Sequence, residues 1–322
     1  MTARAIALIL VRRLAALAIV LVLISLGIFS LLYLAPGNIV QSLIGDQPAT
    51  PQLIATLRHQ YHLDEPFYTQ FWFWLEHAAQ LNFGHSATTG LPVVQTIRER
   101  LGLSFELGLY AFVIIVLIGF PLGIAAALRK RSVVDRSAVG LSVVGVSTPA
   151  FVTGIALLYF LAVRISWFPA YGGGSAGLTS RISHLTLPAI TLALGNTAIV
   201  VKLTRVGMLE ALDQDYVAFA RARGLPKRRV IWSYALRNAL IPVVTASGLM
   251  LGYLLTAAVL VDVTFSLPGM GSLLVDSVSN KDVPTIQGLA LVIATTVVLA
   301  NLLADMLYLL IDPRIRFEGG SA

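Results

Sequence analysis

Six long apolar stretches constrain the fold of this chain more than any other feature of its sequence. A helix needs roughly 20 residues to cross the ~30 Å hydrocarbon core of a bilayer, and each stretch reaches that length. We therefore predict six membrane-spanning helices, near residues 10–34, 104–128, 137–163, 186–206, 241–261 and 286–311.

The composition agrees with a chain that lies mostly in lipid. Hydrophobic residues make up 57% of the 322 residues and charged residues 12%, and the mean hydropathy is +0.82. A net charge of +7 is compatible with a nucleic-acid partner, but the basic residues lie beside apolar stretches and form no separate polar domain. We expect an all-α integral membrane protein that binds no nucleic acid. The absence of Cys excludes disulfides and thiolate metal sites.

Lys and Arg are distributed unequally between the two sides of the predicted spans. With a cytoplasmic N-terminus, the cytoplasmic segments hold 17 of the 23 basic residues and the outside segments hold 6. Since positive loops stay on the cytoplasmic side, both termini are expected there. Arg4, Arg12 and Arg13 precede the first apolar stretch as in a secretory signal, but that stretch is too long and lacks a cleavage site. We expect it to be retained as the first span.

The extracytoplasmic segment, residues 35–97, contains two amphipathic patterns. Thr50 and Pro51 form an N-cap and first-turn pair, and Asp64 is the predicted cap of a second helix that opens at Pro66. Such helices either rest on the membrane or on the protein's own spans, or form a platform for an external partner. The apolar stripes are Leu53, Ile54, Leu57 and Tyr61, and then Phe67, Phe71, Trp74, Leu75 and Ala78.

A polar, basic loop, residues 207–240, separates the fourth and fifth predicted spans. Asp213 and Asp215 are cap-type residues whose charge suits a helix N-terminus. Gly224 has the freedom to end that helix in a left-handed conformation, and Pro226 suits the first turn of a second helix. The sequence therefore predicts a short helix, a tight turn and a helix that returns to the membrane.

The same loop has the features of a docking element for a soluble protein. The small residues Ala218, Ala220 and Ala222 would let a partner surface approach closely. The alternative is a solvated loop that only enforces orientation, but such a loop does not need ordered capping at both ends of a helix.

Several motifs resemble one known family. The loop motif DYVAFARARGLPKRRVIWSYALRNALIP resembles the cytoplasmic signature of membrane subunits of type I ABC importers, specifically the dipeptide and oligopeptide permease group. LRHQYHLDEPFYTQFWFWL, TFSLPGMGSLLVDSVSNKDVPTIQG and NLLADMLYLLIDPRIR are similar to other segments of that group, so the resemblance covers almost the whole chain.

Two positions depart from the family pattern. After the first span the group usually has Pro-Gly-Asp-Pro, where this chain has the four residues Pro-Gly-Asn-Ile at 36–39. The general importer motif is Glu-Ala-Ala followed by Gly, and the aligned residues here are Ala218, Phe219, Ala220 and Gly224. The glutamate is missing, so no role of that carboxylate can be assigned to this chain.

The resemblance implies a non-catalytic permease subunit in the cytoplasmic (inner) membrane of a prokaryote. It implies pairing with a second, homologous permease subunit, two cytoplasmic ABC ATPase domains and an extracytoplasmic solute-binding protein. ATP and Mg would bind to the partner subunits and no cofactor to this chain, which has no phosphate-loop motif. The ATPase-coupling residues would be Asp215, Tyr216, Ala218, Phe219, Ala220, Arg221, Ala222, Arg223, Gly224 and Leu225.

Residues of the transport pathway are harder to find in the sequence. Pro149 interrupts a span, Gly248 and Gly252 have the small-xxx-small spacing of close helix packing, and Asn196 is a polar group in a span. Asp262, with Asp276 and Asp282, lies near the predicted outer mouth, as a contact for a cationic peptide or as a solvated loop charge. The candidates for the pathway or its gating are Pro149, Asn196, Gly248, Gly252 and Asp262.

The expected organisation is an N-terminal span (1–34), the extracytoplasmic segment (35–97), a type-1 ABC transporter transmembrane core (98–311) and a cytoplasmic tail (312–322). The expected function is ATP-driven import of di-/oligopeptides or similar small solutes by alternating access. A secondary transporter would usually show an inverted repeat with paired broken helices, which we do not find. An intramembrane hydrolase is disfavoured because its sequence motifs are missing.

Overall fold

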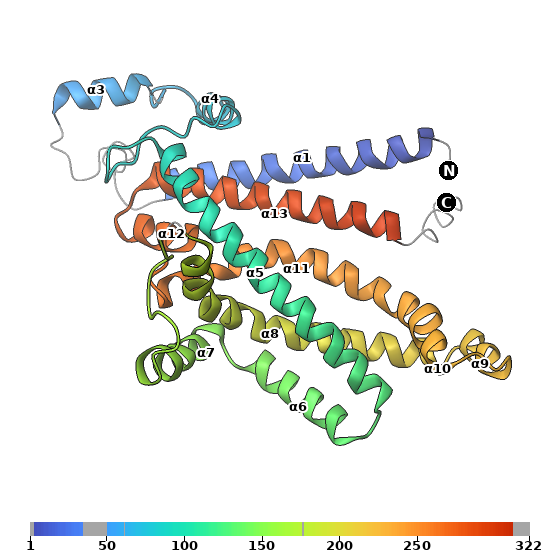
Figure 1. Cartoon of the computed structure of the whole chain (residues 1–322). Coiled ribbons are helices and arrows are strands. Elements are labelled where there is room, and N and C mark those ends of the chain that lie inside the picture. Colours follow the sequence, from blue (N-terminus) through green and yellow to red (C-terminus); the bar gives the residue numbers. More distant parts are fainter. Residues whose placement is uncertain (1–2, 35–49, 61, 176, 312–322) are drawn as a thin grey trace. The chain divides into compact units, whose positions relative to one another are not determined.

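The computed structural model describes residues 3–34, 50–60, 62–175 and 177–311, and these residues are almost entirely helical (Figure 1). The N-terminal part contains α1 (Ala3–Leu34), α3 (Pro51–Gln60), α4 (Phe67–Ala79), α5 (Val93–Leu128), α6 (Val133–Ser147) and α7 (Ala150–Leu157). The C-terminal part contains α8 (Leu178–Leu212), α9 (Asp215–Ala222), α10 (Lys227–Arg229), α11 (Leu236–Thr264), α12 (Met270–Ser279) and α13 (Val283–Ile311). Wider π turns extend α7 over Leu158–Arg164 and join α10 to α11 over Val230–Ala235.

Four described helices are long and apolar enough to cross a membrane, namely α1, α5, α8 and α13. Two further candidates are bent. The α6–α7 pair turns by 103° between Ser147 and Ala150, and α11 bends by 46° near residue 255. The predicted count of six is reached only when each bent pair is one span, so the count stays a prediction.

The predicted span over 137–163 is sharply bent, at the proline that the sequence places as an interruption of this span. Thr148 has an extended backbone and Pro149 precedes the first turn of α7. Because the residue before a proline is disfavoured in helical conformation, the chain leaves the α6 direction at this point. Gly154 of α7 then lies against Thr191 of α8, where an added Cβ would approach the threonine Cγ2 to 3.1 Å.

The described chain divides into two compact units, the first formed by residues 1–104 and 268–298. Its apolar core joins the start of α5 to α12 and α13, with Phe83, Val93, Met270 and Leu289 among the buried residues. Asp282, predicted to be solvated or cargo-facing, is instead buried. Its carboxylate accepts hydrogen bonds from the Ser86 hydroxyl (2.5 Å) and the Ala87 amide (3.1 Å).

Helix α4 packs on α1 within this unit. The Phe29 ring lies 5.7 Å from both the Phe71 and Trp74 rings, centroid to centroid. Pro66, not Asp64, occupies the N-cap position of α4, and no side chain caps it. The opposite face leaves Tyr68 and Trp72 exposed, together with Phe67 and Phe73 at the edges.

The second unit, residues 105–267 and 299–322, is built around α8. This helix contacts α6, α7 and α11, and glycines of α5 let it approach closely. A Cβ on Gly123 would lie 2.6 Å from the Thr204 Cβ, so only glycine fits there without a shift. On another side of α8, a Cβ on Gly207 would lie 2.9 Å from the Ala239 carbonyl of α11. Small residues thus replace a hydrophobic driving force, as is usual between helices in lipid.

Some sequence predictions concern residues outside the described ranges. These are the Pro-Gly-Asn-Ile motif at 36–39, Tyr61 of the first outside stripe and the cytoplasmic tail at 312–322.

Candidate functional site: the coupling loop and a cavity at the α6–α7 break

The loop between α8 and α11 folds as a short helix held by a glycine turn. Helix α9 begins at Asp215, three residues after the end of α8, and ends at Ala222. Gln214 occupies the N-cap position and no side chain caps the helix, so the capping roles predicted for Asp213 and Asp215 are wrong. Asp215 still lies in the first turn, where its negative charge suits the helix dipole.

Gly224 ends α9 as the sequence predicts. Its φ is +73°, its amide donates to the Arg221 carbonyl (2.9 Å) and the Leu225 amide donates to the Ala220 carbonyl (3.3 Å). These two bonds form a Schellman motif, which satisfies carbonyls that a helix end otherwise leaves without partners. Pro226 then takes the N-cap position before α10, and the chain continues through the π turn into α11.

The inner face of α9 packs on the start of the returning helix. Val217 and Ala220 form a buried cluster with Val230, and partly buried neighbours surround it. Ala220 is only 3% exposed, so its predicted place on the docking face is wrong. The neighbours of the cluster are Leu212, Tyr216, Leu225 and Tyr234.

The outer face of α9 is exposed. The Phe219 side chain is 70% exposed at the centre of the helix. Ala218 and Ala222 are exposed, as are Arg221 and Arg223. This face therefore combines one apolar anchor with small and basic neighbours.

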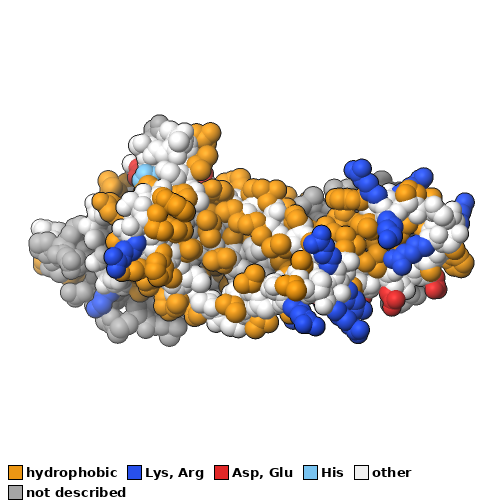
Figure 2. All heavy atoms as spheres, turned by 60° about the horizontal axis from the view of Figure 1, so that its bottom comes forward, with side chains coloured by type: hydrophobic (Ala, Val, Ile, Leu, Met, Phe, Trp, Pro, Cys, Tyr) orange, Lys and Arg blue, Asp and Glu red, His pale blue; other side chains and the backbone are white. Residues whose placement is uncertain are grey.

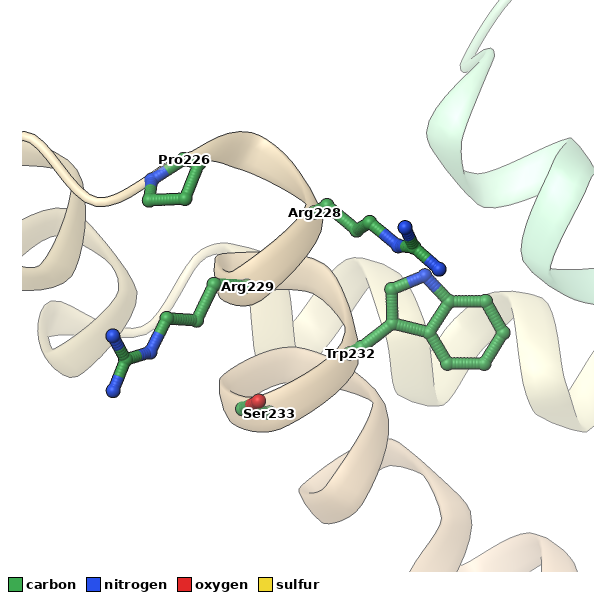
Figure 3. Close-up of a pocket in the computed structure, with 5 residues that line it drawn as sticks. All are labelled: Pro226, Arg228, Arg229, Trp232 and Ser233. Carbon is green, nitrogen blue, oxygen red and sulfur yellow. The ribbon is translucent and has the colours of Figure 1, made fainter.

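Basic side chains surround this end of the second unit. Figure 2 shows Lys and Arg gathered where α9, α10 and the α5–α6 turn lie, beside a broad apolar surface. Next to α9, an open pocket of about 470 Å³ is lined by Pro226, Arg228, Arg229, Trp232 and Ser233. In Figure 3 the Arg228 and Trp232 side chains project to one side of the helix and Arg229 to the other.

A separate cavity of about 610 Å³ opens at the break between α6 and α7. Helices α8 and α11 complete its wall, and no Lys, Arg, Asp or Glu is among the described residues that line it. The Thr148 and Thr153 hydroxyls donate to carbonyls of their own helices (2.8 and 2.7 Å), and the Asn196 amide nitrogen donates to Leu192 (2.9 Å). The two threonine hydroxyls therefore present mainly oxygen acceptors, whereas the Asn196 amide keeps one N–H donor beside its carbonyl oxygen. Tyr253 adds a further polar group from α11.

The predicted pathway residues do not form one cluster. Pro149 and Asn196 line the cavity. Gly248 instead packs on α13, where an added Cβ would lie 2.6 Å from the Ala304 Cβ, and Gly252 is buried. Asp262 is fully buried outside the lining, so its interpretation as a solvated charge is wrong.

Sequence reasoning missed Thr148, Thr153 and Tyr253, which join the two predicted residues in the cavity. A polar residue beside a span-breaking proline was the available signal for Thr148. It also missed the ion pairs of the second unit. Glu106, an ionisable residue within the second predicted span, pairs with Arg181 at 3.0 Å. Among the described residues, no group of three or more His, Cys, Asp or Glu is placed to hold a metal ion.

The fold and the loop define a class, the helical membrane subunit of a transport system. The chain belongs to the family of binding-protein-dependent transport system inner membrane components, whose model matches residues 119–317. The N-terminal model of the same kind of component matches residues 6–108. It is therefore a multi-pass inner membrane protein and a non-catalytic permease subunit, as the sequence predicts.

Several transporter permeases are similar to this chain, and the similarity extends over nearly the whole length of each. A probable peptide ABC transporter permease, y4tP, from Sinorhizobium fredii is 38% identical over 308 residues, covering 95% of this chain and 98% of the relative. The dipeptide transport permease DppB of Escherichia coli is 34% identical over 92% of this chain and 94% of its own. The glutathione transport permease GsiC of Salmonella choleraesuis is 36% identical, covering 95% and 98%.

A solved structure supports the fold independently. The MetNI methionine ABC transporter in an inward-facing conformation matches with a TM-score of 0.58 at 13% identity, covering 68% of this chain and 97% of that chain. The all-α fold class with the architecture of a type I importer is thereby confirmed.

Proposed function

We propose that this chain is one transmembrane half of an ATP-driven importer of di- or oligopeptides, and that α9 couples it to a cytoplasmic ATPase subunit. The observation that carries this proposal is the construction of α9. Its inner face is anchored by Val217, Ala220 and Val230, while its outer face presents an exposed Phe219. A rigid protrusion with an apolar anchor is suited to insertion into a groove of a soluble partner.

The coupling follows from how α9 is attached. Helix α9 connects α8 to α11, and these two helices pack closely at Gly207. A displacement of α9 would therefore move both helices. ATP and Mg on the partner ATPase subunits would draw those subunits together. Their movement would tilt the spans between inward-facing and outward-facing arrangements as near-rigid bodies.

The cavity at the α6–α7 break is our candidate for this chain's share of the transport pathway. Its lining is mostly apolar, and Thr148, Thr153, Asn196 and Tyr253 add uncharged polar groups to it. Such a lining can hydrogen-bond the amide groups common to all peptides and does not select for side-chain charge. Peptide cargo also agrees with the peptide and dipeptide permeases to which the chain is similar. GsiC, named for glutathione, is similar to the same extent, so cargo selection among small peptides would rest on the binding protein.

The external solute-binding protein would dock on the outside helices. Helix α4 rests on α1 through Phe71 and Trp74, and its other face exposes Tyr68 and Trp72. This exposed aromatic face supports the interpretation of the segment as a platform. A second homologous permease, encoded as a separate chain or a copy, would complete the pathway.

Cysteine labelling tests the proposed orientation of the chain in the membrane. Both termini and α9 would be cytoplasmic, supported by the basic side chains around α9 and the α5–α6 turn (Figure 2). The chain has no Cys, so single cysteines at Lys227 and Trp72 give clean labels. An impermeant thiol reagent should label position 72 in intact spheroplasts, and position 227 only after permeabilisation.

Reconstitution tests the function itself. Proteoliposomes with this chain, its partner permease, two ATPase subunits and the binding protein should import labelled dipeptide only when ATP is supplied. Omitting any one component, or replacing the ATPase with a hydrolysis-deficient variant, should abolish import. Peptide uptake by this chain alone, driven by an ion gradient, would instead support the secondary-transporter alternative.

A further inference from the structure

One buried ion pair of the second unit is not explained by the pathway or by the docking face. The Asp135 carboxylate accepts two bonds from the Arg205 guanidinium, from Nε at 2.5 Å and from NH2 at 3.0 Å. The Arg131 amide donates to the same carboxylate at 2.8 Å, and the Ser132 hydroxyl caps α6 by accepting from the Asp135 amide (3.3 Å). Asp135 is only 4% exposed. A bidentate bond of this kind fixes both distance and orientation.

The two residues of the ion pair lie near the ends of different helices. Asp135 is in the first turn of α6, whose far end reaches the cavity at the α6–α7 break. Arg205 is in the last two turns of α8, which leads within three residues into α9. The pair therefore connects the helix that carries the docking element to the helix that borders the proposed pathway.

The rest of the α6–α8 contact is weakly directional. Ala138 of α6 packs with Val201 of α8 and Ala126 of α5, and Gly145 lies against the Ala198 side chain and the Leu194 carbonyl. Such contacts between small residues bring the helices close but contain no charged or bidentate bond that fixes their relative orientation.

The contact between the two helices is also incomplete. An open cavity of about 620 Å³ lies between α6 and α8, lined mainly by apolar side chains that include Val139, Ser142, Val146 and Ile199. Arg205 lies on the border of the same cavity. Close packing therefore holds α6 on one side only, and the ion pair supplies the one charged link that the structure describes between these helices.

We propose that Asp135 and Arg205 form a coupling clamp, a pair of positioning residues that makes α6 follow the movement of α8 and α9. The clamp touches neither the cargo cavity nor the docking face. This inference rests on the proposed function of α9 as the coupling element. Without the clamp, α8 still moves with the ATPase, but α6 lags behind, so ATP is hydrolysed without delivery of cargo.

The test measures the number of ATP molecules hydrolysed for each peptide imported, in the complete reconstituted complex. Asp135→Asn removes the charge, and Arg205→Lys keeps the charge but loses the bidentate geometry. Since removing one partner of a buried pair leaves the other charge uncompensated, we expect Asp135→Asn to raise this ratio about tenfold or more. Arg205→Lys should raise it less. The exchange Asp135→Arg with Arg205→Asp should lower the ratio again toward that of the native complex.

A disulfide between the same helices makes the test specific for mechanical coupling. A Cβ on Gly145 would lie 3.4 Å from the Ala198 Cβ, close to the spacing of natural disulfides. We would add Gly145→Cys and Ala198→Cys to Asp135→Asn and to the native clamp, in a chain with no other Cys. Oxidation should lower the ATP-to-peptide ratio in the Asp135→Asn background, and reduction should raise it again. In the native-clamp background, the same comparison measures the effect of the disulfide on the cavity itself, which Gly145 also lines.

Three results separate the possible failures. If the clamp variants only lower the yield or thermal stability of the complex, and the surviving complexes keep the native ratio, the pair is merely structural and the inference is wrong. The inference also fails if oxidation does not restore coupling. If the native complex shows no ATP-driven import at all, the proposed function fails first, independently of the clamp.

Discussion

Replacement of Gly224 is the most direct test of the coupling loop. Its φ of +73° places it in the left-handed region, and a Cβ built there would meet nothing within 4 Å. Steric contact with neighbours therefore contributes nothing to the cost of a substitution. Within this chain, the cost at the Cβ therefore comes from the backbone conformation.

The magnitude follows from two alternatives open to a substituted residue. Keeping the left-handed conformation costs about 1–2 kcal/mol for an ordinary residue, and more for a β-branched one. Leaving it breaks the hydrogen bonds from Gly224 to Arg221 and from Leu225 to Ala220, at about 0.5–1.5 kcal/mol each. The cheaper alternative costs about 1–2 kcal/mol, which lowers the population of the native loop roughly 5- to 30-fold relative to competing conformations.

The assay compares Gly224→Val with Gly224→Asn and Lys227→Gln in the reconstituted importer. Asn tolerates the left-handed region, and Lys227 is exposed, so both controls should stay near the native level. Gly224→Val should insert into the membrane normally, yet lose most co-purification with the ATPase and most peptide import. Native import and ATPase binding by Gly224→Val would refute the assignment of this loop as the coupling element.

Three further perturbations address the docking face, helix packing and the first unit. Phe219→Ala removes an exposed anchor without disturbing the loop, so ATPase affinity measured by titration should fall by about 2 kcal/mol or more, roughly 30-fold; an unchanged affinity would exclude Phe219 from the interface. Gly248→Leu should lower thermal stability in detergent by an overpacking cost of about 1–3 kcal/mol, and adding Ala304→Gly should recover part of it, unless the two helices are not in contact. Asp282→Asn should destabilise the chain by about 1.5–3 kcal/mol through lost charged hydrogen bonds, whereas the exposed Asp276→Asn should not; equal melting temperatures would contradict the buried network.

The residues of one loop show how far local sequence signals reach. The existence and the end of α9 could be predicted because a glycine turn is a local device, closed by bonds between residues three and five apart. The inward direction of Ala220 could not, because an eight-residue helix of alternating small and large side chains has no clear apolar face. Its orientation depends on Val230, which only the returning helix brings into contact.

The sequence by itself determined that the chain lies in a membrane, that it contains long apolar stretches of spanning length, and where helix α9 ends. These properties depend on hydropathy summed over a span and on conformational preferences of single residues. Only the tertiary structure decided the 103° turn after α6, the cavity beside it and the partners of Asp135 and Asp282. Arg205 lies 70 residues from Asp135, and Ser86 lies 196 from Asp282. Contacts across such separations depend on which helix faces meet, and in lipid most faces are equally apolar, so the pattern along the chain does not specify them.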